Sequence, residues 1–263
     1  FHIITVYLYQ LKHINKIAGI QGGDYVLKMT AKKLGELCGK KVFRITGKRF
    51  LVLTDSLEEY EYYLTQLKQI FDVSIKMDVE HKTIETPAIL SGIINAEKLG
   101  ESELILEYAE YLETLSVQSG LTEVIQDDRQ TMNGFLYNKR VEKYLHTAIT
   151  KDLFEVYYQP VYSTKEKRFL TLEALSRLHH PEFGWIPPDV FIQIAEKNHM
   201  IEQITDLQFC RICRFLKENE DLMNQILNVK VNLSSLDLMR ADCSRHLMRM
   251  MDEFEIPYDW IQF

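Results

Sequence analysis

The chain has few cysteines, glycines and prolines, and it has no long apolar run. Four cysteines among 263 residues do not make a disulfide framework, so the sequence indicates a reducing, cytoplasmic environment. Eleven glycines and six prolines exclude collagen-like and low-complexity chains. No apolar stretch approaches the ~20 residues that a membrane-spanning helix needs. The sequence therefore predicts a globular chain without a membrane segment of its own.

Positive charge is scarce as well, because 31 Lys and Arg stand against 38 Asp and Glu, which gives a net charge of −7. A surface for a nucleic-acid polymer needs clustered Lys and Arg, so that class of partner is excluded. A pocket for a dinucleotide remains open, since a few Arg suffice there. Cys210 and Cys213 have the spacing of a metal site, but no second pair follows, and their helical pattern predicts core packing.

The first half of the chain mixes strand and helix patterns around a central hairpin. Apolar residues at Ile3, Ile4 and Val6 predict a buried strand, and Ser56 with Glu59 forms the capping-box pattern that starts a helix. Such a mixture predicts an α/β sandwich of one sheet and its helices. The expected strands are 3–9, 42–46, 50–54, 73–77 and 88–95, and the expected helices start at Asp24, Ser56 and Glu101.

Over residues 1–125 the chain resembles the GGDEF domain, the diguanylate cyclase fold. The resemblance is carried by Leu11-Lys12, Ile14-Asn15, Gly19, Gly23-Asp24 and Leu27, which follow that family's pattern without a gap. The signature loop, however, reads Thr46, Gly47, Lys48, Arg49 and Phe50, and Tyr7 and Lys16 stand where the family has acidic residues.

Those replacements decide what the resemblance implies about activity. Joining two nucleoside triphosphates requires Mg²⁺, which prefers carboxylate oxygens. Neither Tyr7 nor Arg49 offers one, so we expect a degenerate, cyclase-dead domain with a regulatory role. Asn15 matches the family's guanine-contacting residue, which leaves GTP binding open. The alternative is an Asn that stabilises the turn before a helix.

A polar stretch without apolar periodicity, residues 126–133, predicts a linker. Beyond it, strand and helix patterns alternate, which predicts parallel strands covered by helices, as in a barrel. The polar face of each strand is expected to point inward near the carboxyl ends, where barrel enzymes place their active sites. The expected helices are 134–150, 201–216 and one from Ser234 or Ser235 to Phe254, and the expected strands surround Gln159 and span 169–177, 228–234 and 260–263.

Polar side chains interrupt three of these strand patterns, at Gln159, Glu173 and Asn232. Buried polar groups need partners, so interruptions in successive strands predict one shared site. Taken singly, Glu173 would be a solvated edge charge and Asn232 a turn residue. His179 and His180 are expected in a loop, because adjacent side chains of a strand cannot face one ion.

This set, with Arg177 in the stretch Glu173-Ala174-Leu175-Ser176-Arg177, resembles the EAL family of cyclic di-GMP phosphodiesterases. The likeness implies the amino-terminal portion of an EAL domain over 134–263, a partial TIM-like barrel. It also implies that Glu173 and Asn232 bind Mg²⁺ or Mn²⁺, that Gln159 and Arg177 hold cyclic di-GMP, and that water opens the ring to linear pGpG. The resemblance to the EAL family continues along the sequence through His180-Pro181, Gly184, Ile186, Pro188, Phe191-Ile192 and Ala195-Glu196.

The chain ends where that family continues with further acidic ligands, so we expect the chain by itself not to hydrolyse anything. We expect an intact parent that extends beyond this chain and is tethered to a membrane, if at all, by a segment outside it. The alternative is a receptor or scaffold that binds cyclic di-GMP without turnover. The unpaired edge of a partial barrel, or the cyclase-like domain, also predicts a homodimer.

Overall fold

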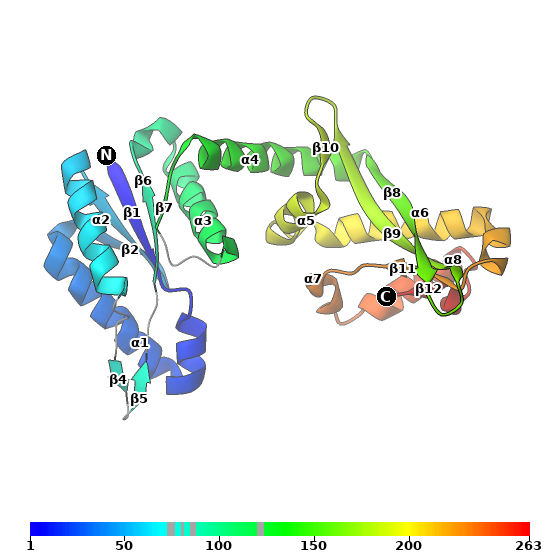
Figure 1. Ribbon diagram of the computed structural model, residues 1–263, viewed down its shortest axis with the longest axis horizontal. Coiled ribbons are helices and arrows are strands. Elements are labelled where there is room, and N and C mark those ends of the chain that lie inside the picture. The colour runs from blue at the N-terminus through cyan, green and yellow to red at the C-terminus, as the bar shows by residue number, and fades with distance from the viewer. Residues whose placement is uncertain (73–76, 80–81, 85–87, 120–123) are drawn as a thin grey trace. The chain divides into compact units, whose positions relative to one another are not determined.

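The computed structural model describes residues 1–72, 77–79, 82–84, 88–119 and 124–263, and these form two compact units, Phe1–Phe135 and Leu136–Phe263 (Figure 1). Both units are mixed α/β, as the alternating patterns predict, and each is built around its own sheet. None of the helices in the described ranges combines the length and the apolarity that a membrane span requires.

A five-stranded sheet forms the centre of the first unit. Its strands, in spatial order, are β2 (Val42–Thr46), β3 (Arg49–Thr54), β1 (His2–Tyr7), β6 (Ile89–Ile93) and β7 (Ile125–Gln126). β1 pairs antiparallel with β3 and β6, whereas β6 and β7 run parallel. β2 and β3 form the predicted hairpin. β4 (Met77–Val79) and β5 (Lys82–Ile84) form a separate two-stranded ribbon.

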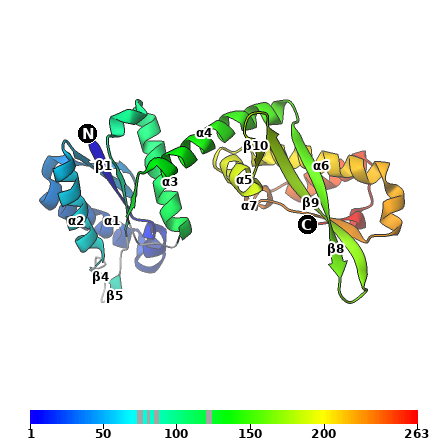
Figure 2. The ribbon, with the colours of Figure 1, turned by 45° about the horizontal axis from the view of Figure 1, so that its top comes forward.

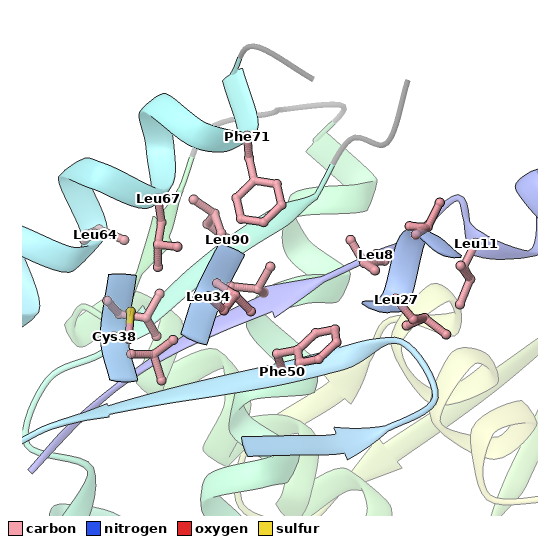
Figure 3. Close-up of a cluster of buried hydrophobic side chains, with 14 of the residues drawn as sticks. Leu8, Leu11, Leu27, Leu34, Cys38, Phe50, Leu64, Leu67, Phe71 and Leu90 are labelled. Carbon is pink, nitrogen blue, oxygen red and sulfur yellow. The ribbon is translucent and has the colours of Figure 1, made fainter. Parts of the chain in front are cut away.

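Alternation along β1 directs its side chains to two cores on opposite faces of this sheet. Ile4 and Val6 belong to a core with α1 (Leu11–Cys38) and α2 (Leu57–Asp72). Figure 3 shows this core, in which Phe50 of β3 lies near Leu34 and Leu27. Ile3 belongs to the other core, with α3 (Ser102–Ser119). The short 3-10 helices are η1 (Gly39–Lys41) and η2 (Ala96–Leu99).

The first long helix begins earlier than the sequence predicts, at Leu11 rather than Asp24. It is interrupted at Gly19, whose φ of 70° and ψ of 176° suit glycine. Glycines near this point lower the helix propensity, but burial of Leu11 and Ile14 stabilises the helix nonetheless. The strand expected over 73–77 lies outside the described residues except for Met77, where β4 begins.

A helix also replaces most of the expected linker. α4 (Arg129–Thr150) begins at Arg129 rather than Gly134, so residues 126–133 are not an irregular connection. A reciprocal cap explains the early start. The Thr131 backbone N–H donates to Asp128 Oδ1 at 2.7 Å, and the Asp128 N–H donates to Thr131 Oγ1 at 2.9 Å.

The sheet of the second unit combines parallel and antiparallel pairs. Its strands are β10 (Gly184–Ile186), β9 (Arg168–His180), β11 (Asn228–Val231) and β12 (Ile261–Gln262) in that order, and β8 (Phe154–Ser163) also pairs with β9. β9, β11 and β12 run parallel, as predicted. β8 and β9 are antiparallel, which corrects the expectation for this pair. The four residues 164–167 that join them are too few for a parallel crossover.

Helices pack against one face of this sheet (Figure 2). Leu172 and Ala174 of β9 belong to a core with α6 (Ile201–Glu218) and α8 (Cys243–Glu253), where Cys213 is buried as predicted. Leu178 belongs to a second core with α4 and α5 (Pro188–Lys197). Glu173 alternates with these apolar residues, so it lies on the opposite face of β9. The shorter helices are η3 (Glu220–Asn224), α7 (Ser235–Leu238) and η4 (Tyr258–Trp260).

The region after β11 differs from the prediction. The strand ends at Val231, so Asn232 lies just beyond it, and the helix expected to reach Phe254 is divided into α7 and α8. Ser234 caps α7, one of the two caps expected. Its hydroxyl accepts from the Leu236 N–H at 3.2 Å, and its own N–H donates to Asp237 at 3.0 Å.

The two adjacent histidines lie in a strand rather than in the predicted loop. His179 and His180 end β9 and pair with Trp185 and Gly184 of β10. Their rings go to different neighbours. His179 lies against Trp185, whereas His180 stacks on Phe183 at 3.7 Å between ring centroids.

Candidate functional site

The two residues predicted to bind a metal are in direct contact. Glu173 lies on β9, and Asn232 directly follows β11, which pairs with β9 in parallel register. Asn232 Nδ2 donates a hydrogen bond to Glu173 Oε1 at 2.9 Å. Because this bond uses the side-chain nitrogen of Asn232, its side-chain oxygen Oδ1 and the second carboxylate oxygen of Glu173 are left to bind a cation.

Gln159 lies beside this pair. It is the direct cross-strand partner of Glu173 in the antiparallel β8–β9 ladder, and its side chain is exposed. Opposite residues in such a ladder project from the same face, with Cβ atoms about 4.5–5.5 Å apart. The structure therefore brings Gln159, Glu173 and Asn232 together.

Arg177 is on the same face but further along the strand. It lies four residues after Glu173, which corresponds to roughly 13 Å. Its Nη1 donates to the Ser176 carbonyl at 2.9 Å, and its guanidinium carbon lies 5.7 Å from the Tyr157 ring centroid. Glu155 is its cross-strand partner. Arg177 thus stands apart from the Glu173–Asn232 pair and can contact a different part of an extended ligand.

A cavity of about 420 Å³ opens between this sheet and helices α5 and α6. Arg177 and Asn232 line it, whereas Glu173 and Gln159 do not. Gln208 also lines it, buried, and within the described part of the chain neither its amide nitrogen nor its oxygen has a hydrogen-bond partner. The remaining lining residues are Val156, Ala174, Leu175, Ser176, Pro188, Phe191, Ile192, Glu196, Ile201, Ile204, Thr205, Ile212, Val231, Leu233, Ser234 and Ser235.

Sequence reasoning missed an aromatic cluster on the Glu173 face. The Tyr157 and Trp185 ring centroids are 5.9 Å apart with the ring planes at 75°, and His179 meets Trp185 at 5.1 Å and 80°. Tyr157 is 47% exposed and Trp185 51%. A signal was present, because Tyr157 precedes Gln159 by two residues on one strand and therefore shares its face.

The altered positions of the predicted GGDEF resemblance also lie close together. Tyr7 and Arg49 are cross-strand partners. Lys48 Nζ lies 4.7 Å and the Arg49 guanidinium carbon 5.6 Å from the Tyr7 ring centroid. Arg49 is buried and donates to both oxygens of Glu113, at 2.8 and 2.7 Å, and to Glu110 at 2.9 Å. Cationic side chains thus stand where the resemblance would place a metal.

Asn15 lies within α1, not in the turn before a helix that the alternative interpretation assumed. Asn15 and Lys16 are both exposed. A Cβ added to Gly23 would lie 1.9 Å from Asn15 Oδ1, so the Asn15 side chain rests directly on Gly23. In this position the exposed amide lies over a glycine that has no Cβ to displace it.

The remaining positions of the altered signature loop form the tip of the β2–β3 hairpin. Arg44 closes this tip, because its Nη2 donates to the Gly47 carbonyl at 2.9 Å and its Nε to the Thr46 carbonyl at 3.4 Å. Phe50 is 1% exposed and belongs to the core. This segment therefore anchors the hairpin through backbone carbonyls and an apolar side chain.

The second unit offers two oxygen ligands to a divalent cation, the Glu173 carboxylate and the Asn232 amide. Such hard donors suit Mg²⁺ or Mn²⁺, and Mg²⁺ is commonly held by one or two carboxylates together with substrate oxygens and water. Over the described ranges, three or more His, Cys, Asp or Glu side chains do not gather into a metal-binding group. The Glu173–Asn232 pair therefore fits part of a coordination shell.

Comparison with known proteins identifies the second half of the chain. Residues 142–263 match the family model of the EAL domain. The chain is 27% identical over 232 residues to the cyclic di-GMP phosphodiesterase NbdA of Pseudomonas aeruginosa, which covers 88% of this chain and 30% of that protein. It is 40% identical over 88 residues to the probable cyclic di-GMP phosphodiesterase PdeN of Escherichia coli, covering 34% and 17%. The chain thus matches about a third or less of the length of these curated relatives.

A solved structure shares the fold over most of the chain. It is the S helix-GGDEF-EAL portion of LapD from Vibrio cholerae bound to cyclic di-GMP, with a TM-score of 0.60 and 13% identity, covering 96% of this chain and 59% of that one. At this identity the likeness concerns the fold alone. The match to the family model therefore supports the predicted EAL domain over residues 142–263, and the GGDEF resemblance of the first half stays a prediction.

Proposed function

We propose that the EAL domain of residues 142–263 makes the intact protein a metal-dependent phosphodiesterase, which opens cyclic di-GMP to linear pGpG. The observation that carries this proposal is the 2.9 Å contact between two oxygen-bearing side chains, that of Glu173 on β9 and that of Asn232, which directly follows the neighbouring strand β11. Curated relatives named as cyclic di-GMP phosphodiesterases support the choice of substrate.

The four site residues have different roles in this proposal, two in metal binding and two in ligand binding. Glu173 and Asn232 would hold the cation, which when bound polarises a phosphoryl oxygen and lowers the pKa of a bound water. Gln159, opposite Glu173, presents an amide that donates and accepts hydrogen bonds at the same phosphodiester. Arg177, roughly 13 Å away, suits bidentate contact with a second phosphate. That spacing fits a ligand with two phosphodiester groups.

The first unit serves, in this proposal, as a regulatory domain without cyclase activity. The absence of cyclase activity is supported by the hydrogen bonds of Arg49 with Glu113 and Glu110, because they hold a guanidinium and not a carboxylate beside Tyr7. Residual GTP binding at Asn15 is tested by titrating GTP into the chain. Absence of binding at about millimolar nucleotide ends that idea. Size-exclusion chromatography at rising concentration tests the proposed homodimer.

Replacement of Glu173 by Gln tests the phosphodiesterase directly. Glu173→Gln keeps the shape and the contact with Asn232 but removes the negative charge that binds a divalent cation. We expect hydrolysis of cyclic di-GMP by the intact protein, followed as pGpG by chromatography, to fall by at least about 10²-fold. Glu166→Gln, in the exposed turn between β8 and β9, is the matched control and should retain full turnover. If folded Glu173→Gln protein hydrolyses cyclic di-GMP as fast as the unmodified protein, the proposal is wrong.

A further inference from the structure

The exposed aromatic pair Tyr157–Trp185 has no part in holding the metal, yet it shares a face with the residues that do. Both rings are about half exposed, at 47% and 51%, so each leaves a large apolar area in contact with water. Apolar rings left in water beside a polar site indicate a surface that a ligand covers.

The geometry of the pair leaves room for a third ring. The Tyr157 and Trp185 planes cross at 75°, so they meet edge to face, and this contact occupies one flat side of only one of the two rings. His179 meets Trp185 in the same manner at 80°. An aromatic face that is open to solvent is what a nucleobase needs for stacking, and such stacking tolerates any base.

Charge next to the rings identifies the kind of ligand. The Arg177 guanidinium carbon lies 5.7 Å from the Tyr157 centroid, so a cation that suits phosphate stands directly beside the platform. Arg177 also lines the 420 Å³ cavity on the helix side of the sheet, together with Asn232, whereas Tyr157 and Trp185 do not line it. A phosphate at Arg177 therefore places the attached base within reach of Tyr157 and Trp185.

We propose that Tyr157 and Trp185 form a stacking platform for one guanine base of the cyclic dinucleotide whose adjoining phosphate is held by Arg177. This inference rests on the proposed function and deepens it, because it adds residues that determine affinity without touching the metal. The platform acts on binding of the base, whereas Glu173 and Asn232 act on the scissile phosphodiester.

A second aromatic pair, with one ring on β8 and one on β9, provides an internal control. Tyr162 and Phe169 also meet edge to face, with centroids 5.4 Å apart and exposures of 51% and 57%. They lie at the amino-terminal end of β9, away from Arg177 and from the carboxyl ends where parallel-sheet sites form. Exposure and ring geometry are thus similar, and the two pairs differ in their position relative to Arg177 and in the second ring, which is Phe169 in place of Trp185.

Tryptophan fluorescence reports on the platform directly. The chain contains two tryptophans, Trp185 and Trp260. In a Trp260→Phe background, titration of the full chain with cyclic di-GMP and Mg²⁺ should quench or shift the emission of Trp185 saturably. Calorimetry on the same samples gives the Kd independently of fluorescence.

Affinity of variants separates the platform from the function on which it rests. Trp185→Leu and Tyr157→Leu should each weaken binding roughly 5- to 100-fold, Trp185→Phe should recover most of it, and Phe169→Leu should bind like the unmodified chain. Unchanged affinity in both leucine variants, with cyclic di-GMP still bound by the parent chain, overturns the platform and leaves the function standing. Absence of any binding both to the unmodified chain and to the intact protein overturns both. If Trp185→Leu fails to fold, the test rests on the affinity of Trp185→Phe and on the change in Trp185 emission when cyclic di-GMP is added. An emission that does not change at saturating ligand overturns the platform.

Discussion

Replacing Arg49 with Met is expected to loosen the first unit, because it leaves a buried carboxylate without its partner. Arg49 is 8% exposed and Glu113 3%, and the guanidinium donates to both oxygens of Glu113, at 2.8 and 2.7 Å. Burial raises the pKa of Glu113, and the Arg49 charge opposes that rise. Arg49→Met keeps an apolar stem of similar length but removes these bonds and the one to Glu110.

The size of the effect follows from burial. Removing one partner of a buried ion pair costs about 3–5 kcal/mol, and each ~1.4 kcal/mol is a factor of ten in an equilibrium constant. Opening of the first unit should therefore become more frequent by on the order of 10²- to 10³-fold. Arg44→Met is the matched control, because Arg44 is exposed and, among the described residues, donates hydrogen bonds to backbone carbonyls only, and it should cost no more than about 1 kcal/mol. Arg49→Met combined with Glu113→Leu should recover most of the loss.

Labelling of one buried thiol measures this opening within the intact chain. Cys38 is the single cysteine of residues 1–135 and is 3% exposed, so a thiol reagent reaches it only when the first unit opens. Mass spectrometry of the Cys38 peptide gives the labelling rate for each variant. A rate for Arg49→Met within about threefold of that for Arg44→Met would refute the reasoning, since it would mean that Glu113 is not stranded.

Two further outcomes can be measured on the same chain. Burial raises the pKa of Cys38 to about 11 and that of Cys213 to about 12, so at pH 8 their thiolate fractions are on the order of 10⁻³ and 10⁻⁴. Cys210 is only partly buried and should be labelled before both, as peptide mapping of the folded protein would show; earlier labelling of Cys213 contradicts the packing of α6. Hydrogen bonds from Lys41 lower the pKa of Glu59 from 4.5, so its stabilisation is present above pH 4.5 and disappears as the pH falls through the folded-state pKa. In Glu59→Gln, the melting temperature should fall less steeply than in the unmodified chain as the pH is lowered below 4.5. An unchanged pH dependence of the melting temperature argues against the Lys41 contact.

Local patterns predicted local structure well. The β2–β3 hairpin follows from two alternating runs around Gly47, and the cap at Ser56 is confirmed because its hydroxyl accepts from the Glu59 N–H at 3.2 Å. The two faces of β9 were also predicted, since alternation alone places Leu172 opposite Glu173. In each case the information lies within a few residues of sequence.

Long-range partners were beyond the reach of such patterns. Arg49 was recognised as a loss of metal binding, but its pairing with Glu113, 64 residues later, depends on how α3 packs on the sheet. Apolar periodicity likewise does not reveal whether two strands run parallel or antiparallel. β8 and β9 were expected to be parallel, but their four-residue connection permits only the antiparallel pairing. The start of α1 was missed because glycine lowers helix propensity locally while core burial of Leu11 outweighs it.

In the candidate site, types of residue were easier to predict than their distances. The contact of Asn232 with Glu173 was expected as shared ligation and appears as a hydrogen bond. Trp185 was missed because it belongs to β10, whose pairing with β9 is fixed by the turn after His180 and not by any apolar alternation.

The short reversal between β8 and β9 has a consequence for how the site assembles during folding. Gln159 and Glu173 are neighbours across one hairpin, so this half needs only the closure of a small loop, which is fast and costs little chain entropy. Asn232 lies 59 residues after Glu173, with α5 and α6 between them, so its contact requires the closure of a much longer loop. We therefore expect a two-step maturation, in which the ligand-holding hairpin exists before the second oxygen donor reaches it.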